Sequence, residues 1–448
     1  MTECDVVVIG LGPGGESVAS TLAKEGLDVV GVDERLVGGE CPYYGCIPSK
    51  MMVRAADALA ESRRVPDLAG TSTTTPDWSR VADRIRDEAT DDWDDTVAVQ
   101  RLEDAGVRFV RGHGRLVGER EVEVGGERFR ARRGVVLNTG TAPAVPPIDG
   151  LADTPYWTNR DAVRVTTLPA SLIVIGGGAI GAEMAQALAR FGVHVTVVEA
   201  AERILAPEEP EASAVVAKTF AGEGIQVLTG AQARSVEYDE GRFTVRLDDQ
   251  VLTADKLLVA TGRRPNLADI GLDTVGLDPD SRAVEVDDRM RGGEGLWAIG
   301  DITGKGAFTH VSMYQSAVAS RDILGQSGPA ADYRAVPRVT FTDPEVGSVG
   351  MTEQQAQDAG LNVRVGVTDI ASAARGWIGK AEGLIKLVED ADRGVLVGAT
   401  SVGPMGGDVL SMLTTAVHAE VPTATLRSMI YAYPTFHRAV EAALDELG

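Results

Sequence analysis

The sequence predicts an α/β protein with two Rossmann-like dinucleotide-binding domains and an α+β domain at its C-terminal end. Near the N-terminus a buried strand runs into a glycine-rich turn and an alanine-rich helix, and the same succession returns in the middle of the chain. From about Val336 the pattern changes to one that is typical of an α+β domain.

Length, charge and cysteine count exclude several classes of protein. A chain of 448 residues is long enough for two to four domains. A net charge of −23 makes nucleic acid and anionic membranes poor partners, and no apolar run is as long as a membrane span. Three cysteines are too few for a secreted disulfide scaffold, and a strand beginning almost at once leaves no room for a signal peptide. We therefore expect a cytoplasmic protein, with Cys4 in its core.

The first glycine-rich turn has the sequence context of a dinucleotide-binding site. It follows the apolar strand Asp5–Ile9 and opens a helix, and the strand Asp28–Val32 ends at Asp33 about twenty residues later. The glycines let the backbone approach a pyrophosphate, the helix N-terminus faces its charge, and Asp33 can accept hydrogen bonds from ribose hydroxyls. The glycines of this turn are Gly10, Gly12, Gly14 and Gly15.

The second glycine-rich turn repeats the arrangement. Strand Ser171–Ile175 leads into it, a helix follows, and strand His194–Val198 ends at Glu199. Two complete fingerprints indicate two bound nucleotides, and the alternative is one fold duplicated with one site idle. The glycines of the second fingerprint are Gly176, Gly178 and Gly181.

Two cysteines, Cys41 and Cys46, stand five residues apart in a segment that ends at Lys50. On an ideal helix such residues rise about 7.5 Å, which exceeds the roughly 4.4–6.8 Å between the Cα atoms of a disulfide. A bridge would need an irregular turn, which Pro42 and Gly45 suit. Thiols at a helix N-terminus have a depressed pKa and are reactive. We therefore predict a redox pair, and the alternative is two buried structural cysteines.

The remaining pattern places the domain boundaries. Helical periodicity runs from about Pro48 to Ala105, interrupted by the polar loop Thr71–Pro76, and prolines within 143–147 indicate a linker. Strand 296–301 carries Asp301 at its C-terminal end, where ligands of open α/β sheets bind. Short strands are expected at 108–110, 121–124, 129–130 and 134–137, and a last helix at 434–447. The predicted domains are 1–148, 149–265, a central segment 266–334 that returns to the first domain, and 335–448.

These parts, in this order, resemble the flavoprotein disulfide reductases, the family of dihydrolipoamide dehydrogenase, glutathione reductase and mercuric reductase. The resemblance covers essentially the whole chain, and its most specific element is Cys41-x4-Cys46-Ile-Pro-Ser-Lys50. Supporting motifs are Asn138-Thr-Gly140, Ala260-Thr-Gly-Arg-Arg-Pro-Asn266, Ala298-Ile-Gly-Asp301 and Phe341-Thr-Asp-Pro-Glu-Val346.

The resemblance implies that the first domain binds FAD, that the second binds a nicotinamide nucleotide, and that domain 335–448 forms the interface of a homodimer. Asp301 would bind the ribityl region of FAD, and the alternative is a strand-end cap. No resident metal is expected. The residues implied for FAD are Gly10, Gly12, Gly14, Gly15, Asp33, Glu34, Gly39, Lys50, Gly114, Thr139, Gly140, Asp301 and Thr309. Those implied for the nicotinamide nucleotide are Gly176, Gly178, Gly181, Glu199 and Gly262.

The same resemblance implies a route for electrons. Hydride would pass from NADH to the flavin, and electrons would pass on to a Cys41–Cys46 disulfide. Cys41 would then reduce a small disulfide or another electrophilic acceptor, while Cys46 would be the charge-transfer thiol against the flavin. Lys50 would lie by the flavin and pair with Glu183, and the alternative is an ordinary surface ion pair.

Glu199 predicts which nicotinamide nucleotide is preferred. Its carboxylate can accept hydrogen bonds from both adenosine ribose hydroxyls and would repel a 2′-phosphate. NADH should therefore be preferred over NADPH, although Arg203 is near enough in sequence to weaken the preference.

The chain departs from the family pattern where the acceptor reacts. Relatives that exchange thiols carry a C-terminal His-Pro-Thr and, five residues after the His, a Glu that orients it for proton transfer. Tyr433 takes the catalytic position of that His, and Arg438 takes the position of the Glu; His437 lies one turn further on. A tyrosine, with an ordinary pKa of about 10, is a poor base at neutral pH. Glu40 replaces a Thr and should disfavour a Cys41 thiolate.

These departures predict weak turnover of dihydrolipoamide or glutathione disulfide. The chain also ends without the cysteine pair of mercuric reductases. Two alternatives stay open: an NADH-dependent reductase of quinones or other electrophiles that acts directly from the flavin, and a flavin-bearing redox sensor or binding protein.

Overall fold

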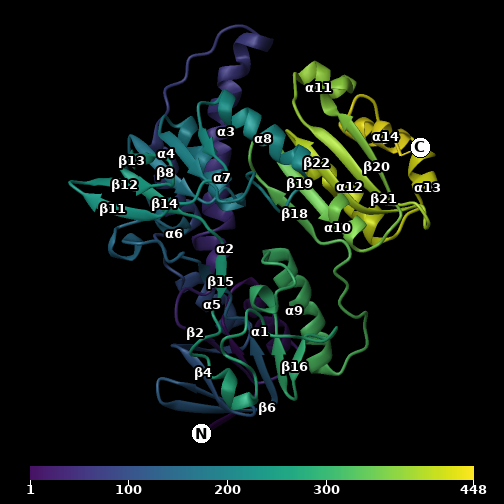
Figure 1. The fold of residues 1–448 in the computed structure, drawn as a ribbon. Coiled ribbons are helices and arrows are strands. Elements are labelled where there is room, and N and C mark those ends of the chain that lie inside the picture. Colours follow the sequence, from purple (N-terminus) through teal and green to yellow (C-terminus); the bar gives the residue numbers. More distant parts are fainter. Residues whose placement is uncertain (448) are drawn as a thin grey trace. The chain divides into compact units, whose positions relative to one another are not determined.

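The structure, a computed structural model, describes residues 1–447 and divides into two compact units, which are described separately (Figure 1). Unit 1 consists of Met1–Pro48, Asp83–Ala144 and Arg263–Tyr333. Unit 2 consists of Ser49–Ala82, Val145–Gly262 and the chain from Arg334 onward. None of the helices within residues 1–447 combines the length and the apolar character that crossing a membrane requires.

Unit 1 is built around an eight-stranded sheet. Strands β17, β6, β1, β2 and β3 are parallel neighbours in that order, and β16 pairs antiparallel with β17 at one edge. Strands β4 and β5 extend from β6 as an antiparallel pair. The central strands are rich in valine because both faces of the sheet are covered. The bounds are β1 (Thr2–Ile9), β2 (Val29–Asp33), β3 (Val107–Arg111), β4 (Gly114–Gly118), β5 (Glu121–Val124), β6 (Glu127–Leu137), β16 (Arg291–Gly293) and β17 (Leu296–Ala298).

Two helices of unit 1, α1 (Pro13–Lys24) and α9 (Thr309–Leu324), pack side by side on one face of this sheet (Figure 1). A Cβ atom on Gly14 would lie 2.1 Å from the Ser312 hydroxyl oxygen, so the two helices approach as closely as only glycine permits. The other unit 1 elements are α2 (Glu40–Tyr43), the π-helix η1 (Ile85–Ala89), α5 (Thr96–Asp104), β7 (Thr141–Pro143), β15 (Arg263–Pro265), η3 (Leu272–Val275) and η4 (Gly300–Thr303).

Unit 2 contains a second parallel sheet, in the order β10, β9, β8, β14, with a three-stranded antiparallel sheet beside it. The two sheets share one core, which includes Ile173 of the first and Phe243 of the second. The strands are β8 (Ser171–Ile175), β9 (His194–Val198), β10 (Gln226–Leu228), β11 (Ser235–Asp239), β12 (Arg242–Arg246), β13 (Val251–Ala254) and β14 (Lys256–Val259). The helices are η2 (Leu151–Asp153), α6 (Asn159–Ala162), α7 (Ala179–Arg190) and α8 (Pro210–Gly222). Two more helices belong to both units: α3 (Cys46–Leu68) begins in unit 1 and ends in unit 2, and α4 (Trp78–Arg84) begins in unit 2 and ends in unit 1.

The C-terminal part of unit 2 is a five-stranded antiparallel sheet in the order β18, β19, β22, β21, β20. Helices α12 and α14 pack on it through a single apolar core. The strands are β18 (Pro337–Thr340), β19 (Glu345–Gly350), β20 (Val363–Asp369), β21 (Leu384–Asp390) and β22 (Val395–Gly403). The helices are α10 (Glu353–Asp358), η5 (Ile370–Ser372), α11 (Ala374–Gly379), α12 (Gly406–His418), α13 (Thr423–Arg427) and α14 (His437–Asp445).

Several elements differ from what the sequence predicted. The strands predicted at 129–130 and 134–137 are one eleven-residue strand, β6. It continues through Gly134, where a Cβ atom would lie 2.1 Å from the carbonyl oxygen of Gly295. Strand β4 was not expected, and the last helix begins at His437 rather than Pro434. The Thr435 hydroxyl donates to the carbonyl oxygen of Ala432, which closes a separate turn before that helix.

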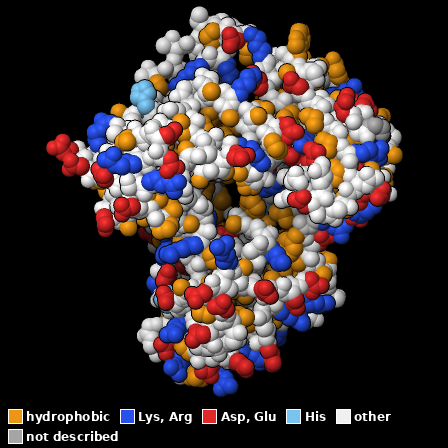
Figure 2. Space-filling view, viewed as in Figure 1, with side chains coloured by type: hydrophobic (Ala, Val, Ile, Leu, Met, Phe, Trp, Pro, Cys, Tyr) orange, Lys and Arg blue, Asp and Glu red, His pale blue; other side chains and the backbone are white. Residues whose placement is uncertain are grey.

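On the face drawn in Figure 2, acidic and basic side chains are interspersed rather than gathered into one patch. Many acids pair with a nearby arginine, as Asp248 does with Arg234 at 2.7 Å. Such exposed pairs each contribute little to stability. The acidic side chains of that face are therefore not concentrated in one place.

Candidate active site

The first glycine turn has the shape that a pyrophosphate requires. A Cβ atom on Gly10 would lie 2.3 Å from the carbonyl oxygen of Asn138, and one on Gly15 would lie 2.0 Å from that of Gly10. Both positions therefore need glycine for packing. Gly12 is different, because among the described residues other than its chain neighbours the only atom within 4 Å of its added Cβ is the Asn138 amide nitrogen at 3.4 Å. The backbone at Gly12, which caps helix α1 without a side-chain hydrogen bond, is open to an anion.

The second glycine turn repeats this geometry. A Cβ atom on Gly176 would lie 2.4 Å from the carbonyl oxygen of Ala260, and one on Gly181 would lie 2.0 Å from that of Gly176. Gly178 caps helix α7 without a side-chain hydrogen bond, and a Cβ atom there would meet no heavy atom of residues 1–447 within 4 Å. Both turns therefore fit a dinucleotide at the start of a helix.

The acid after each second strand holds its own glycine turn. Asp33 Oδ2 accepts the N–H of Leu11 at 2.7 Å, and Glu199 Oε2 accepts the N–H of Gly177 at 2.6 Å. The other oxygen of each acid accepts a backbone N–H two residues on. Burial raises the pKa of Asp33 above its usual value. Each oxygen keeps a lone pair, so both acids can still accept a ribose hydroxyl.

The loop after β6 is fixed by the central segment. The Thr139 hydroxyl donates to the carbonyl oxygen of Asn266 at 2.8 Å, and the Asn266 amide donates to that of Thr139 at 2.9 Å. Gly140 accepts the backbone N–H of Asn266. The strand predicted over 296–301 ends at Ala298, and Asp301 lies in the short helix η4 that follows it, where it accepts the Thr141 hydroxyl at 2.6 Å. The structure thus brings the expected residues Thr139, Gly140 and Asp301 into one end of the unit 1 sheet.

Gln315 supports Asp301, and the sequence analysis did not identify it as a residue of the site. Its side chain is fully buried; Oε1 accepts the N–H of Gly300 at 2.6 Å, and Nε2 donates to the Thr303 hydroxyl at 3.0 Å. It therefore shapes the turn that carries Asp301. The buried side of α9 mixes serines with apolar residues, so no clear pattern in the sequence marked this glutamine.

The remaining expected FAD residues of unit 1 lie in varied surroundings. Gly39 packs on the first glycine turn, since a Cβ atom there would lie 2.9 Å from the Cα of Gly12. Gly114 packs on the sheet, where its Cβ would lie 3.0 Å from Ile9. Glu34 is half exposed and pairs with His113 at 3.0 Å. In unit 2, a Cβ atom on Gly262 would meet no heavy atom of the described residues within 4 Å.

The two cysteines lie on either side of a break between helices. Cys41 belongs to α2, which ends at Tyr43, and Cys46 begins α3. A Cβ atom on Gly45 would lie 3.2 Å from the carbonyl oxygen of Glu40 and 3.7 Å from the Cα of Cys41. The irregular turn that a disulfide would need is therefore present, and a side chain at position 45 would crowd it. In this structure no disulfide joins Cys41 to Cys46.

The pKa of Cys41 is raised, whereas a depressed value was expected for a thiol at a helix N-terminus. The first cause is the hydrogen bond between the two thiols of Cys41 and Cys46, and the second is burial. The Thr309 hydroxyl, 3.3 Å from Cys46 Sγ, acts in the opposite direction on Cys41. A helix of four residues provides little dipole to offset these effects. In the dithiol, Cys41 therefore keeps its proton.

Glu40 is not the cause of that shift, contrary to expectation. Its Oε2 lies 3.3 Å from the guanidinium of Arg263, which compensates its charge. Arg263 also donates to the hydroxyl and the carbonyl oxygen of Thr141, both at 2.7 Å. Arg263 thus ties the start of α2 to the strand β7. The sequence motif contained Arg263 but gave it no role.

In unit 2, Lys50 pairs with Glu183. Lys50 Nζ lies 2.5 Å from Oε2 of Glu183, whose side chain is 5 % exposed. The other oxygen of Glu183 accepts the N–H of Phe341 at 2.9 Å, and Lys50 Nζ lies 4.7 Å from the centre of the Phe341 ring. Helices α3 and α7 are therefore joined through the segment that follows β18. The role of Lys50 toward a flavin stays a prediction.

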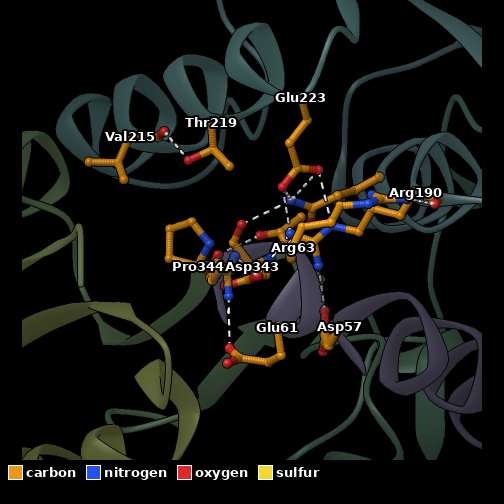
Figure 3. A network of polar contacts seen from close by, with 12 residues as sticks. Asp57, Glu61, Arg63, Arg190, Val215, Thr219, Glu223, Asp343 and Pro344 are labelled. Atoms are coloured by element: carbon orange, nitrogen blue, oxygen red, sulfur yellow. Dashed lines mark hydrogen bonds and ion pairs between the residues drawn. The ribbon is translucent and has the colours of Figure 1, made fainter. Parts of the chain in front are cut away.

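The same two helices are joined again by a buried arginine (Figure 3). The Arg190 side chain is 1 % exposed and pairs with Asp57 at 2.7 Å, Glu223 at 2.6 Å and Asp343 at 2.8 Å. Gln186 donates to the carbonyl oxygen of Asp343 and accepts its N–H. Such a buried network fixes geometry, and removing one partner leaves a charge without compensation.

Asp57 predicts a pH dependence of stability. Burial raises its pKa to about 6, and Arg190 only partly opposes this. In the unfolded chain the value is about 3.9, so the folded state binds the proton more tightly. This carboxyl therefore lowers stability as pH rises from about 4 through 6. Asp57→Asn should reduce the fall in unfolding free energy between pH 5 and pH 7, measured by urea titration. An equal fall in both proteins would contradict the assignment.

The C-terminal segment has Tyr433 and Arg438 at the positions of the acid–base pair of the thiol-exchanging relatives. Tyr433 is 73 % exposed, and Arg438 pairs with Glu441 at 2.5 Å on its own helix. His437 is the first residue of α14. Within the described part of unit 2, no carboxylate is hydrogen-bonded to the Tyr433 hydroxyl.

Comparison with known proteins defines the family. Residues 4–319 match the family described as pyridine nucleotide-disulphide oxidoreductase, and residues 336–444 match its dimerisation domain. The chain therefore belongs to the pyridine nucleotide-disulphide oxidoreductases, which use FAD and NAD(P)H. The resemblance drawn from the motifs is confirmed. So is the fold class, with two dinucleotide-binding domains and a C-terminal dimerisation domain.

Individual relatives carry different names. A dihydrolipoyl dehydrogenase of Thermus scotoductus is 33 % identical over 100 % of this chain and 98 % of its own. A mercuric reductase of Acidithiobacillus ferrooxidans is 32 % identical over 98 % of this chain and 82 % of its own. Among solved structures, the Cu(II) complex of the HOCl-induced flavoprotein disulfide reductase RclA from Escherichia coli has a TM-score of 0.88 at 26 % identity, covering 99 % of each chain.

Proposed function

We propose that this protein is an NADH oxidoreductase that reduces its Cys41–Cys46 pair and passes the electrons to a small disulfide or another electrophilic acceptor. The observation that carries the proposal is the pair of thiols at the break between α2 and α3, with Thr309 within hydrogen-bond distance of Cys46. Two buried structural cysteines would need neither the break nor a polar neighbour. The proposed functional domains are 1–148, 149–265, 266–334 and 335–448.

The residues that would hold the cofactors are those of the two glycine turns and their supports. Gly12 and Asp33 would receive the pyrophosphate and ribose of FAD, with Asp301 and Lys50 toward the flavin. Gly178, Glu199 and Gly262 would hold NADH. When bound, FAD accepts a hydride from the nicotinamide and supplies an electron pair to the cysteine disulfide.

The chain's own residues then determine which acceptor reacts. Transfer to an external disulfide requires a Cys41 thiolate, which attacks one sulfur while the other leaves as a thiolate and takes up a proton. Cys46 next attacks the mixed disulfide, which restores the internal bridge and releases the second thiol. A raised Cys41 pKa and the exposed Tyr433 both work against this exchange near neutral pH.

A quinone or metal ion is therefore the favoured class of acceptor, because neither needs a proton delivered at sulfur. The Cu(II) complex of RclA supports including a metal ion. The test is steady-state NADH oxidation with a quinone, Cu(II), lipoamide and glutathione disulfide. We expect the first two to sustain turnover and the disulfides to be slow. If purified protein carries no flavin even after incubation with FAD, and no acceptor sustains NADH oxidation, the proposal fails.

The proposal also includes a cytoplasmic homodimer. The dimerisation domain supports assembly, and Ile430, beside the Tyr433 position, is 99 % exposed with Met429 at 42 %. Apolar side chains so exposed indicate a surface that a partner covers. Light scattering at working concentration tests this, and a fully active monomer would refute it.

NADH should be used in preference to NADPH. Arg203, which could have favoured a 2′-phosphate, donates instead to the carbonyl oxygen of Leu205 and the Ser213 hydroxyl. The carboxylate of Glu199, at the end of β9, is then the charged group that we expect to face the adenosine ribose. We expect kcat/KM to be higher for NADH than for NADPH. We expect Glu199→Gln to lower the ratio of these two values. An advantage for NADPH in the unmodified protein would contradict this.

A further inference from the structure

We infer that the turn Thr90–Asp95, called here the 90–95 turn, positions the cysteine pair, with Trp93 as the positioning residue. This deepens the proposed function and rests on it. The Trp93 indole N–H donates to the carbonyl oxygen of Tyr43 at 3.1 Å. Tyr43 is the last residue of α2, directly before the break that separates Cys41 from Cys46.

The 90–95 turn has a backbone conformation that its sequence does not favour. Asp91, Asp92 and Trp93 have φ values of 48°, 53° and 59°, in the left-handed region. Residues with a Cβ atom visit this region singly and at a cost, so three in succession need support from their surroundings. Strain of this kind gathers at sites with a function, where neighbouring contacts hold it.

The support comes from the π-helix before the turn. Thr90 is 1 % exposed, and its hydroxyl donates to the carbonyl oxygen of Ile85 at 3.0 Å. The N–H of Asp92 donates to the carbonyl oxygen of Arg86 at 2.7 Å. The end of the π-helix therefore determines where Trp93 lies.

The turn contacts the cysteine segment on both sides of Cys41. Before it, the N–H of Val37 donates to Asp95 Oδ2 at 2.7 Å, and Arg111 holds the same oxygen at 2.6 Å. After it, Trp93 binds the Tyr43 carbonyl oxygen. Helix α2 has only four residues, too few to fix its own conformation. The 90–95 turn thus supplies contacts that α2 cannot.

The Tyr43 carbonyl group decides whether the helix is broken. In an unbroken helix it would accept the N–H of Ile47, four residues on. Cys41 and Cys46 would then be about 7.5 Å apart along the axis, beyond disulfide reach. By binding this carbonyl group from outside, Trp93 favours the broken form, in which the bridge can close. Loss of the hydrogen bond between Trp93 and Tyr43 should therefore favour the dithiol over the disulfide.

The experiment equilibrates the holoenzyme with mixtures of reduced and oxidised glutathione. Oxidation of the pair transfers two electrons to glutathione disulfide, which takes up the two thiol protons and leaves as two glutathione thiols. Alkylation and mass spectrometry report the dithiol fraction. We expect Trp93→Phe, which keeps an aromatic ring and removes the indole N–H, to shift the equilibrium constant about three- to tenfold toward the dithiol. Tenfold corresponds to about 30 mV.

Trp78→Phe is the matched control. The Trp78 indole N–H also donates to a backbone carbonyl oxygen, that of Val165 at 2.7 Å, but in unit 2. The Trp78→Phe variant should have a lower melting temperature and an unchanged equilibrium between dithiol and disulfide. An unchanged equilibrium in Trp93→Phe, or an equal shift in Trp78→Phe, would overturn the inference.

A second pair of variants decides the matter if Trp93→Phe does not fold. Asp92 is exposed, and its substitution leaves both partners of the Trp93–Tyr43 bond in place. Asp92→Gly suits the left-handed conformation and should leave the equilibrium unchanged, whereas Asp92→Val opposes it and should shift it toward the dithiol. Equal behaviour of the two variants would overturn the inference. Failure of NADH to reduce any acceptor would instead overturn the proposed function, because this equilibrium is measured without turnover.

Discussion

Cys41→Ser is expected to lower kcat/KM for disulfide acceptors by at least about 10⁴-fold, the scale seen when an enzyme loses its nucleophile. The thiolate is the attacking species, and a serine hydroxyl can neither displace a thiol nor form the internal bridge. Reduction of the bound flavin by NADH does not involve Cys41 in the proposed route, so its rate should stay within a few-fold. Stopped-flow absorbance gives this rate, and steady-state assays give kcat/KM.

Cys4→Ser is the control for a general effect of losing a thiol. Cys4 is fully buried in β1, and burial raises its pKa to about 11, so it takes no part in exchange. This variant should keep both half-reactions. If quinone reduction survives Cys41→Ser undiminished, the alternative of direct reduction from the flavin is correct for that acceptor. If disulfide reduction survives, the assignment of Cys41 is wrong.

Restoring the acid–base pair is expected to raise dihydrolipoamide turnover about a hundredfold to ten-thousandfold, the usual contribution of general acid–base catalysis. The substitutions are Tyr433→His and Arg438→Glu. Because Arg438 pairs with Glu441, a glutamate there would face a second carboxylate. Glu441→Gln should therefore accompany them. The gain should be largest near neutral pH, where the dihydrolipoamide thiol, which must lose its proton before it attacks the Cys41–Cys46 disulfide, is most dependent on a base.

Two single variants show whether the unmodified segment already supplies a base. Tyr433→Phe removes the hydroxyl, and His437→Ala removes the nearest imidazole in sequence. Neither should change dihydrolipoamide turnover. A marked loss of dihydrolipoamide turnover in either variant would mean that the substituted residue already acts as the base. Unmodified protein that turns over dihydrolipoamide as fast as NADH reduces its flavin would likewise refute this interpretation.

The sequence predicted the fold best where apolar strands meet glycine turns. Strands β8 and β9 have in the structure the bounds that were expected, because each is an apolar run with clear turn residues at its ends. Strand β6 was divided in the prediction because Arg132, Arg133 and Gly134 interrupt its apolar residues. Its continuity depends on pairing with β1, which no local pattern reveals.

The same limit applies to the candidate site. Residues in motifs, such as Cys41, Lys50 and Asp301, could be found because the chemistry requires them at fixed spacing. Gln315, Arg190 and Trp93 could not, because each acts on residues far away in the sequence. A buried polar side chain has no periodic signal, and its partners emerge only when the chain has folded.

The hydrogen bond between each strand-end acid and its glycine turn occurs in both dinucleotide folds, at matching positions and with nearly equal lengths. Leu11 and Asp33 form it in unit 1, and Gly177 and Glu199 form it in unit 2. A contact common to both halves cannot tell a flavin nucleotide from a nicotinamide nucleotide. Exchanging the two glycine turns between the halves should therefore leave each half with its own ligand. Selectivity then belongs to the segments that have no counterpart in the other half, and those are where an altered cofactor should be engineered.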